Sequence, residues 1–178
     1  MLKKNIFLDQ VYNIKLYNWS DTRLFAQIIS SFLKEGDVVT LRGNIGAGKT
    51  TLARHLIRAI DEDDELEVSS PTYAIMHSYN TSRFEICHYD FYRLTSTNEL
   101  YELNFLDNLE NVVSIIEWPE IASEILPDGC IEIYISEIWH GEVDYRRIRL
   151  TVCIITAERM DKALEMWSSL KRSSLTLD

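Results

Sequence analysis

The sequence predicts one α/β domain, and three observations support this prediction. Segments with apolar residues at helical spacing alternate with short apolar runs that are typical of buried strands. The 178 residues include 46% hydrophobic and 26% charged residues, which are ordinary proportions for a globular protein. We find no internal repeat and no low-complexity segment that would divide the chain. We therefore expect residues 1–178 to form a single domain.

The first predicted helix begins at Ser20 or Asp21, whose side chains can cap free N–H groups. Gly36 can adopt a positive φ and ends this helix. Residues 38–41 form a short apolar run and predict a buried strand, and residues 51–60 predict a second helix. The apolar faces of the two helices consist of Leu24, Phe25, Ile28, Ile29, Phe32 and Leu33, and of Leu52, Leu56 and Ile60.

The rest of the chain continues the alternation of helices and strands. We expect a solvated acidic loop at 61–67, strands at 84–89 and 112–116, a helix and turn at 98–109, strands at 131–135 and 147–153, and a helix at 157–170. The two late strands would pair across His140 and Gly141. The last helix would pack on the body through Met160, Leu164, Trp167 and Lys171, and residues 171–178 would be loose.

Charge and composition exclude several classes of protein. The formal net charge is −10 and the pI is about 4.9, so tight, autonomous binding to nucleic acid is not expected. Cys87, Cys130 and Cys153 form no CxxC pair, which argues against a zinc site or a disulfide framework and favours buried thiols. Neither a signal peptide nor an apolar run of membrane-spanning length is present, so we expect a cytoplasmic protein.

One segment carries a strong chemical signal, the run GNIGAGKT at residues 43–50. It matches the phosphate-binding pattern GxxxxGK[ST] at every fixed position, between a predicted strand and a predicted helix. Glycines let the backbone curl so that N–H groups and the helix dipole face phosphate oxygens. Lys49 would supply positive charge to the β- and γ-phosphates, and Thr50 would offer its hydroxyl to Mg²⁺.

A magnesium ion in such a site usually also needs a carboxylate at the end of a nearby strand. Two acids qualify, because Glu117 follows the apolar run 112–116 and Asp90 follows the run 84–89. Spacing alone does not decide which of these strands lies beside the phosphate loop. Either acid can also be an ordinary exposed residue at a strand end.

Four motifs in this order resemble those of one bacterial family. They are GNIGAGKTT at 43–51, SSPTY at 69–73, HYDFYRL at 88–94 and IIEWPE at 115–120. Together they resemble the TsaE family, formerly YjeE, over about residues 20–147. That family supplies the ATPase for making threonylcarbamoyladenosine at position 37 of tRNAs that read ANN codons. The phosphate loop alone is widespread, whereas the combination of the four motifs is much more specific.

The resemblance implies a fold and a set of site residues. The fold would be a three-layer P-loop nucleotide-binding domain with a mixed central sheet. Residues required for ATP turnover would be Lys49, Thr72, Asp90 and Glu117, with Thr72 in a switch-like loop and Tyr92 and Arg93 flanking Asp90. Nucleotide contacts would come from Ile45, Gly46, Ala47, Gly48, Lys49, Thr50, Thr51 and Trp118. Thr50 and Glu117 would hold Mg²⁺, and residues 19–22 would approach the base.

The same resemblance implies partners and a reaction. The protein would bind ATP and Mg²⁺ and hydrolyse ATP slowly when alone. It would act on the complex of TsaB and TsaD and meet tRNA only indirectly, with no membrane contact. A P-loop small-molecule kinase is the alternative, although Arg83 and Arg93 are too scattered to suggest an arginine-rich lid. A GTP-dependent switch is disfavoured because no Asn-Lys-x-Asp motif is present.

Several residues also have ordinary structural interpretations. Thr72 can belong to a simple Ser-Pro turn, Trp118 can be plain packing, and the cluster of Arg146, Arg147 and Arg149 is most simply surface strand charge. The four histidines, His55, His77, His88 and His140, show no ligand spacing and are interpreted as structural. Asn44 and Ile45 replace the acid and leucine common in the family, and the tail after about residue 151 has no clear counterpart.

Overall fold

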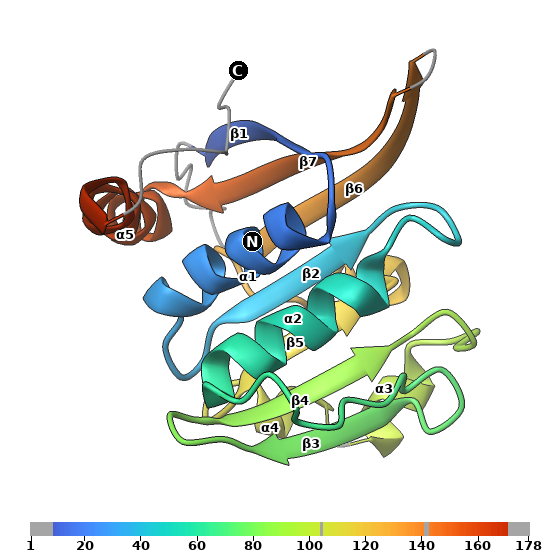
Figure 1. The fold of residues 1–178 in the computed structure, drawn as a ribbon. Coiled ribbons are helices and arrows are strands. Elements are labelled where there is room, and N and C mark those ends of the chain that lie inside the picture. Colours follow the sequence, from blue (N-terminus) through green and yellow to red (C-terminus); the bar gives the residue numbers. More distant parts are fainter. Residues whose placement is uncertain (1–8, 104, 141–142, 171–178) are drawn as a thin grey trace.

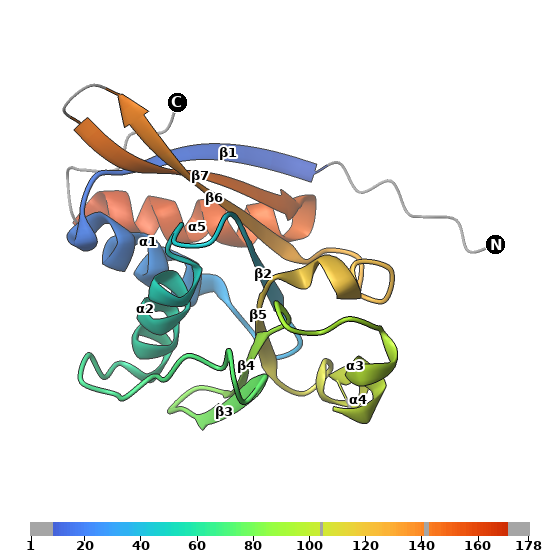
Figure 2. The same cartoon turned by 90° about the vertical axis from the view of Figure 1, so that its right-hand side faces the viewer.

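The computed structural model describes residues 9–103, 105–140 and 143–170. Its elements are β1 (Asp9–Leu16), α1 (Trp19–Phe32), β2 (Val38–Arg42), α2 (Lys49–Asp61), β3 (Met76–Asn80), β4 (Glu85–Asp90), α3 (Asn98–Glu102), α4 (Phe105–Asn108), β5 (Val113–Glu117), the 3₁₀ turn η1 (Pro119–Ala122), β6 (Ile131–His140), β7 (Val143–Cys153) and α5 (Ile154–Leu170). A sheet lies between two helical layers, with α1, α2 and α5 on one face and α3, α4 and η1 on the other (Figures 1 and 2).

The sheet has seven strands in the order β1-β7-β6-β2-β5-β4-β3. The four inner strands β6, β2, β5 and β4 are mutually parallel, and the outer pairings β1–β7, β7–β6 and β4–β3 are antiparallel. The three-layer fold with a mixed central sheet is therefore confirmed. Because β2 is central, the loop that follows it opens at the carboxyl edge of the parallel strands, where α/β proteins bind their ligands.

Two apolar cores fill the spaces between the layers. The larger core packs α1, α2 and α5 on the sheet and includes Phe25, Ile29, Leu41, Leu56 and Ile115, all almost fully buried. The smaller core lies under α3 and α4, where Tyr89, Phe91 and Phe105 pack with ring centroids 5.2–5.5 Å apart. Together the cores fix the positions of β2, β5 and β4, the strands that lead into the site.

Most expected elements are present, with shifted ends. The helix predicted at 51–60 begins at Lys49, and the C-terminal helix begins at Ile154 instead of 157. The late strands do pair, but they extend over 131–140 and 143–153, well beyond the predicted 131–135 and 147–153. Strands β1 and β3 were not expected. The side chain of Trp167 and residues 171–178 lie outside the described residues.

The expected cap of the first helix was wrong. Asn18 is the N-cap, because its Oδ1 accepts a hydrogen bond from the backbone N–H of Asp21 at 3.0 Å. Asp21 Oδ2 in turn accepts from the backbone N–H of Tyr17 at 2.8 Å. This reciprocal arrangement resembles a capping box and satisfies donors at the start of the helix. It also fixes the direction in which the chain enters α1.

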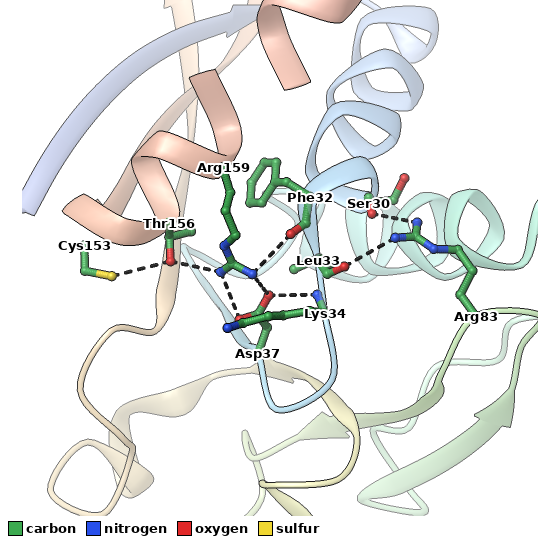
Figure 3. Close-up of polar contacts among 9 residues, drawn as sticks. All are labelled: Ser30, Phe32, Leu33, Lys34, Asp37, Arg83, Cys153, Thr156 and Arg159. Atoms are coloured by element: carbon green, nitrogen blue, oxygen red, sulfur yellow. Dashed lines mark hydrogen bonds and ion pairs between the residues drawn. The ribbon is translucent and has the colours of Figure 1, made fainter. Parts of the chain in front are cut away.

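The C-terminal helix is anchored to the turn between α1 and β2 by Arg159. Its guanidinium donates to both carboxylate oxygens of Asp37, at 2.9 and 3.0 Å, and to the carbonyl oxygen of Phe32 at 3.2 Å (Figure 3). A similar link on the other side joins Arg83 to the carbonyl oxygens of Ser30 and Leu33. Over the described ranges, no helix has the length and apolar character needed to cross a membrane.

Candidate nucleotide-binding site

The glycine-rich loop joins the end of β2 to the start of α2 and depends on three positive φ angles. These are 141° at Gly43, 83° at Gly46 and 103° at Gly48, values that glycine adopts most readily. At Gly43, a Cβ would also lie 2.3 Å from the carbonyl oxygen of Ile135, so no larger residue fits. At Gly46 and Gly48 the space is open, and it faces the first turn of α2, whose N–H groups lack helical partners. The loop is therefore built to take an anion.

Lys49 lies folded across this loop. Its Nζ donates to the carbonyl oxygens of Gly43 and Asn44, at 2.8 Å each, and sits 3.7 Å from the centre of the Trp118 ring. Burial lowers the pKa of Lys49, while the charges of Glu117 and other nearby acids oppose that shift. Trp118 reaches the lysine from a turn with φ of 55°, a left-handed value that is uncommon for a bulky residue.

Glu117 lies at the carboxyl end of β5, directly beside β2, and its side chain is 2% exposed. Its Oε2 accepts a hydrogen bond from Thr50 Oγ1 at 2.8 Å, and its Oε1 lies 3.0 Å from Nε2 of His88. Asp90 ends β4, one strand further from β2. Of the two acids left open by the sequence, Glu117 is therefore the one that contacts the phosphate loop.

Asp90 is tied to the segment that precedes β3. Its Oδ2 accepts from the hydroxyl of Thr72 at 2.7 Å, and its Oδ1 accepts from the backbone N–H of Tyr92 at 3.0 Å. Thr72 also lies 2.9 Å from the hydroxyl of Ser70. This contact brings the SSPTY segment to the same place as the phosphate loop, although the two lie on different elements.

Two cavities meet at the phosphate loop. One, of about 350 Å³, is lined by Ile45, Gly46, Gly48, Lys49, Thr50, Thr51, Thr72, Asp90, Tyr92, Glu117 and Trp118. The other, of about 290 Å³, is lined by Leu16, Tyr17, Asn18, Trp19, Thr22, Gly46, Ala47, Gly48, Thr51, Leu52, Ile135, Tyr145, Arg146 and Ile148. We call them the phosphate-side and base-side cavities. They share Gly46, Gly48 and Thr51, so one extended ligand can occupy both.

The donor set suits a magnesium ion that keeps most of its water and phosphate ligands. Thr50 and Glu117 offer oxygen atoms side by side, as Mg²⁺ prefers. No group of three or more His, Cys, Asp or Glu side chains in the described part of the chain could hold a metal ion. The small number of protein ligands is what a magnesium site beside phosphates needs, since Mg²⁺ there usually takes one or two carboxylates or hydroxyls.

The residues implied for ATP turnover, nucleotide contact and Mg²⁺ all line one of these two cavities, and Trp19 and Thr22 of the segment 19–22 line the base-side cavity. Arg93 does not; it lies outside both cavities, with its guanidinium 5.1 Å from the centre of the Tyr73 ring. Arg147 and Arg149 are exposed on β7, as expected of surface charge, whereas Arg146 lines the base-side cavity and pairs with Glu137 at 3.0 Å.

Two histidines interpreted from the sequence as structural are buried in contact with residues that line the cavities. His88 contacts Glu117, and the ring of His55 meets that of Trp19 edge-on at 4.9 Å. The sequence did contain a signal for His88. Residues two apart on a strand share a face, and Asp90, a predicted site residue, follows His88 by two positions. What was missing was the neighbouring strand that places Glu117 beside it.

A glycine-rich loop between a central parallel strand and a helix, with a lysine, a threonine and a carboxylate on the adjacent strand, defines a P-loop nucleotide-binding protein. Comparison with known families identifies the particular one. The family described as threonylcarbamoyl adenosine biosynthesis protein TsaE matches residues 16–147. The chain belongs to the TsaE family and so to the machinery of tRNA threonylcarbamoyladenosine biosynthesis.

Individual relatives agree with this assignment. A tRNA threonylcarbamoyladenosine biosynthesis protein TsaE from Rickettsia felis is 39% identical over 118 residues, which are 66% of this chain and 68% of that protein. The Bacillus subtilis protein of the same name is 32% identical over 125 residues, 70% of this chain and 77% of that one. The crystal structure of Bacillus subtilis YdiB matches the fold with a TM-score of 0.68 at 24% identity, covering 90% of this chain and 98% of that one.

Proposed function

We propose that this protein binds ATP with Mg²⁺, hydrolyses it, and acts on the TsaB–TsaD complex during tRNA modification. The observation that carries the proposal is the cluster of Lys49, Thr50 and Glu117 in the phosphate-side cavity. The triphosphate would lie along the glycine loop on the phosphate side. The base would enter the base-side cavity, between the aromatic rings of Tyr17, Trp19 and Tyr145.

The residues around the phosphate-side cavity would have different roles in hydrolysis. Lys49 would leave its loop carbonyls and the Trp118 ring to balance charge on the β- and γ-phosphates. Thr50 and Glu117 would hold Mg²⁺, which when bound neutralises charge that develops on the phosphate oxygens. Asp90 and Thr72 face the same cavity, and we assign them to holding the attacking water.

The partner proposal is supported by the rim of the phosphate-side cavity. Ile45, Tyr73 and Tyr92 are 72%, 88% and 53% exposed, which is unusual for three large apolar side chains in one area. Ile45 and Tyr92 line the cavity itself, and Tyr73 adjoins Thr72. A protein that covers this rim would exclude bulk water, other than the attacking molecule, from the reacting phosphate and complete the site.

The deciding experiment measures ATP hydrolysis by the purified protein, first alone and then with purified TsaB and TsaD. We expect slow turnover alone and stimulation by the pair. Lys49→Ala should abolish both the slow turnover and its stimulation. It should also weaken ATP binding by about 10- to 100-fold, because charge-assisted hydrogen bonds to phosphate are lost. Lys162→Ala, an exposed lysine on α5, is the matched control and should behave like the wild type.

The opposite result is equally informative. ATP binding without any complex or stimulation with TsaB and TsaD would contradict the partner proposal. Transfer of the γ-phosphate to a metabolite in that case would favour the small-molecule kinase. Full ATP affinity in Lys49→Ala would overturn the assignment of the phosphate loop.

A further inference from the structure

A histidine buried beneath the site contacts Glu117 from the neighbouring strand. His88 on β4 is fully buried, and its Nε2 lies 3.0 Å from Glu117 Oε1. The other oxygen of the same carboxylate accepts from Thr50 at 2.8 Å. The three side chains thus form a line from inside the sheet to the phosphate loop, with Glu117 in the middle.

The direction of the histidine bond follows from the chemistry of the two groups. An ionised carboxylate only accepts hydrogen bonds, so the Nε2 of His88 carries the hydrogen and donates it. The remaining nitrogen, Nδ1, is buried and has no hydrogen-bond partner among the residues that the structure describes. The imidazole therefore makes its single polar contact with Glu117.

Packing alone does not explain a histidine at this position. The same face of β4 carries Ile86 before His88, and the residue opposite His88 on β5 is Ile115, so apart from Asp90 and Glu117 at the strand ends these neighbours are apolar. Burying an imidazole there costs free energy that an apolar side chain would not. What the histidine adds is an N–H directed at one carboxylate oxygen of a side chain that is itself only 2% exposed.

We propose that His88 is a positioning residue that holds Glu117 Oε1, so that Oε2 stays directed at Thr50 and the pair is arranged for Mg²⁺ before the ion arrives. This inference rests on the proposed binding of ATP with Mg²⁺. Partners that orient a ligating side chain commonly change metal affinity by about 10- to 100-fold when they are removed. Without His88, the carboxylate can rotate, and the arrangement must be recovered when Mg²⁺ binds.

The test measures how much Mg²⁺ strengthens ATP binding, as the ratio of ATP dissociation constants in EDTA and in saturating Mg²⁺. The two informative variants are His88→Gln and His88→Asn, both neutral amides that differ in reach. The longer glutamine can bring an N–H to Glu117 Oε1, and it should keep the ratio within about threefold of the wild type. The shorter asparagine cannot reach, and its ratio should fall about tenfold or more.

The controls separate positioning from folding and from the proposed function. ATP affinity in EDTA should stay the same in both variants, which also shows that they are folded. His77→Leu, on β3 in register with His88 but without a contact to Glu117, should keep the full ratio. In a Glu117→Gln background, His88→Asn should cause no further loss, because the two residues act through one contact.

Each outcome has one meaning. A wild-type ratio near one would overturn the proposed use of Mg²⁺. Two other outcomes would overturn only the role of His88. In one, the wild-type ratio is large and survives in His88→Asn. In the other, the large ratio is lost equally in the glutamine and asparagine variants. If the asparagine variant does not fold, His88→Leu replaces it, with the same expected loss and the same comparison with glutamine.

Discussion

At the residue scale, the three cysteines differ in ways that their spacing does not reveal. The sequence suggested three buried thiols, but only Cys87 is buried, and Cys130 and Cys153 are partly exposed. Burial raises the pKa of Cys130 to about 12. Burial would also raise that of Cys153, but hydrogen bonds from Thr156 and from the backbone at the start of α5 outweigh it and lower the pKa.

These pKa shifts predict the order of reaction with a thiol reagent. The thiolate is the reactive form, and a lowered pKa increases its fraction at neutral pH, so Cys153 should react first. Iodoacetamide at pH 7.5, followed by mass spectrometry of peptides, should modify Cys153 at least about tenfold faster than Cys130. Cys153→Ser should remove the fast phase. Equal rates at Cys130 and Cys153 would contradict the environment described for the start of α5.

The site residues show what a sequence can and cannot predict at this scale. Lys49 and Thr50 were predictable because their positions in the loop are fixed by the chemistry of phosphate binding. Spacing alone did not choose between Asp90 and Glu117, since that choice depends on which strand lies next to β2; only the family resemblance implied Glu117. The contact of His88 with Glu117 also depends on which strands are neighbours, because the two residues are 29 positions apart in the chain and lie on different strands.

At the scale of elements, the link between α5 and the α1–β2 turn predicts a measurable contribution to stability. Arg159 and Asp37 are largely buried, and their two hydrogen bonds hold the C-terminal helix against the body (Figure 3). Arg159→Ala leaves part of Asp37 unpaired, so we expect the free energy of unfolding to fall by about 1–3 kcal/mol. Urea unfolding checks this, and Glu158→Ala, the exposed neighbour, should change stability by less than about 0.5 kcal/mol.

A second variant tests whether the loss comes from this pair. In the background of Asp37→Asn, removal of Arg159 should cost clearly less than in the wild type, because the partner charge is already absent. Additive losses would mean that Arg159 stabilises the protein through its other contacts, the carbonyl of Phe32 and the hydroxyl of Thr156.

The two strands that the sequence did not predict are the two edges of the sheet. β1 and β3 each pair on one side only, and both leave alternate side chains to solvent. Their apolar content is diluted, so the pattern that marks a buried strand is weak. The inner strands β2 and β5, in contrast, are buried on both faces and read as continuous apolar runs. The helix and turn predicted at 98–109 are two short helices, α3 and α4, in the structure.

At the scale of the whole molecule, the site joins parts of the chain that only the complete sheet brings together. The base-side cavity is built from the β1–α1 junction and the β6–β7 hairpin, and the phosphate-side cavity from the ends of β2, β4 and β5. Both therefore depend on the native strand order. A ligand that fills both cavities must then stabilise the folded chain as a whole.

This coupling predicts that ATP and inorganic triphosphate stabilise the protein to different extents. A ligand that binds only the native state adds about 2.7 kcal/mol when its concentration is 100 times its dissociation constant. In the proposed binding mode triphosphate would occupy only the phosphate-side cavity, whereas ATP would also place its base beside Trp19. At equal concentrations with Mg²⁺, ATP should therefore raise the midpoint of thermal unfolding more than triphosphate does.

Trp19 allows the base contribution to be isolated, because its side chain is 66% exposed and its removal should not disturb the core. In Trp19→Ala the shift caused by ATP should approach that caused by triphosphate, while the triphosphate shift stays at its wild-type value. Tyr101 is a 54% exposed aromatic residue on α3 outside both cavities, and Tyr101→Ala should leave both shifts unchanged. Equal shifts from ATP and triphosphate in the wild type would mean that the base does not use this cavity. The protein would then bind its ligand through the phosphates, without a contact to the base.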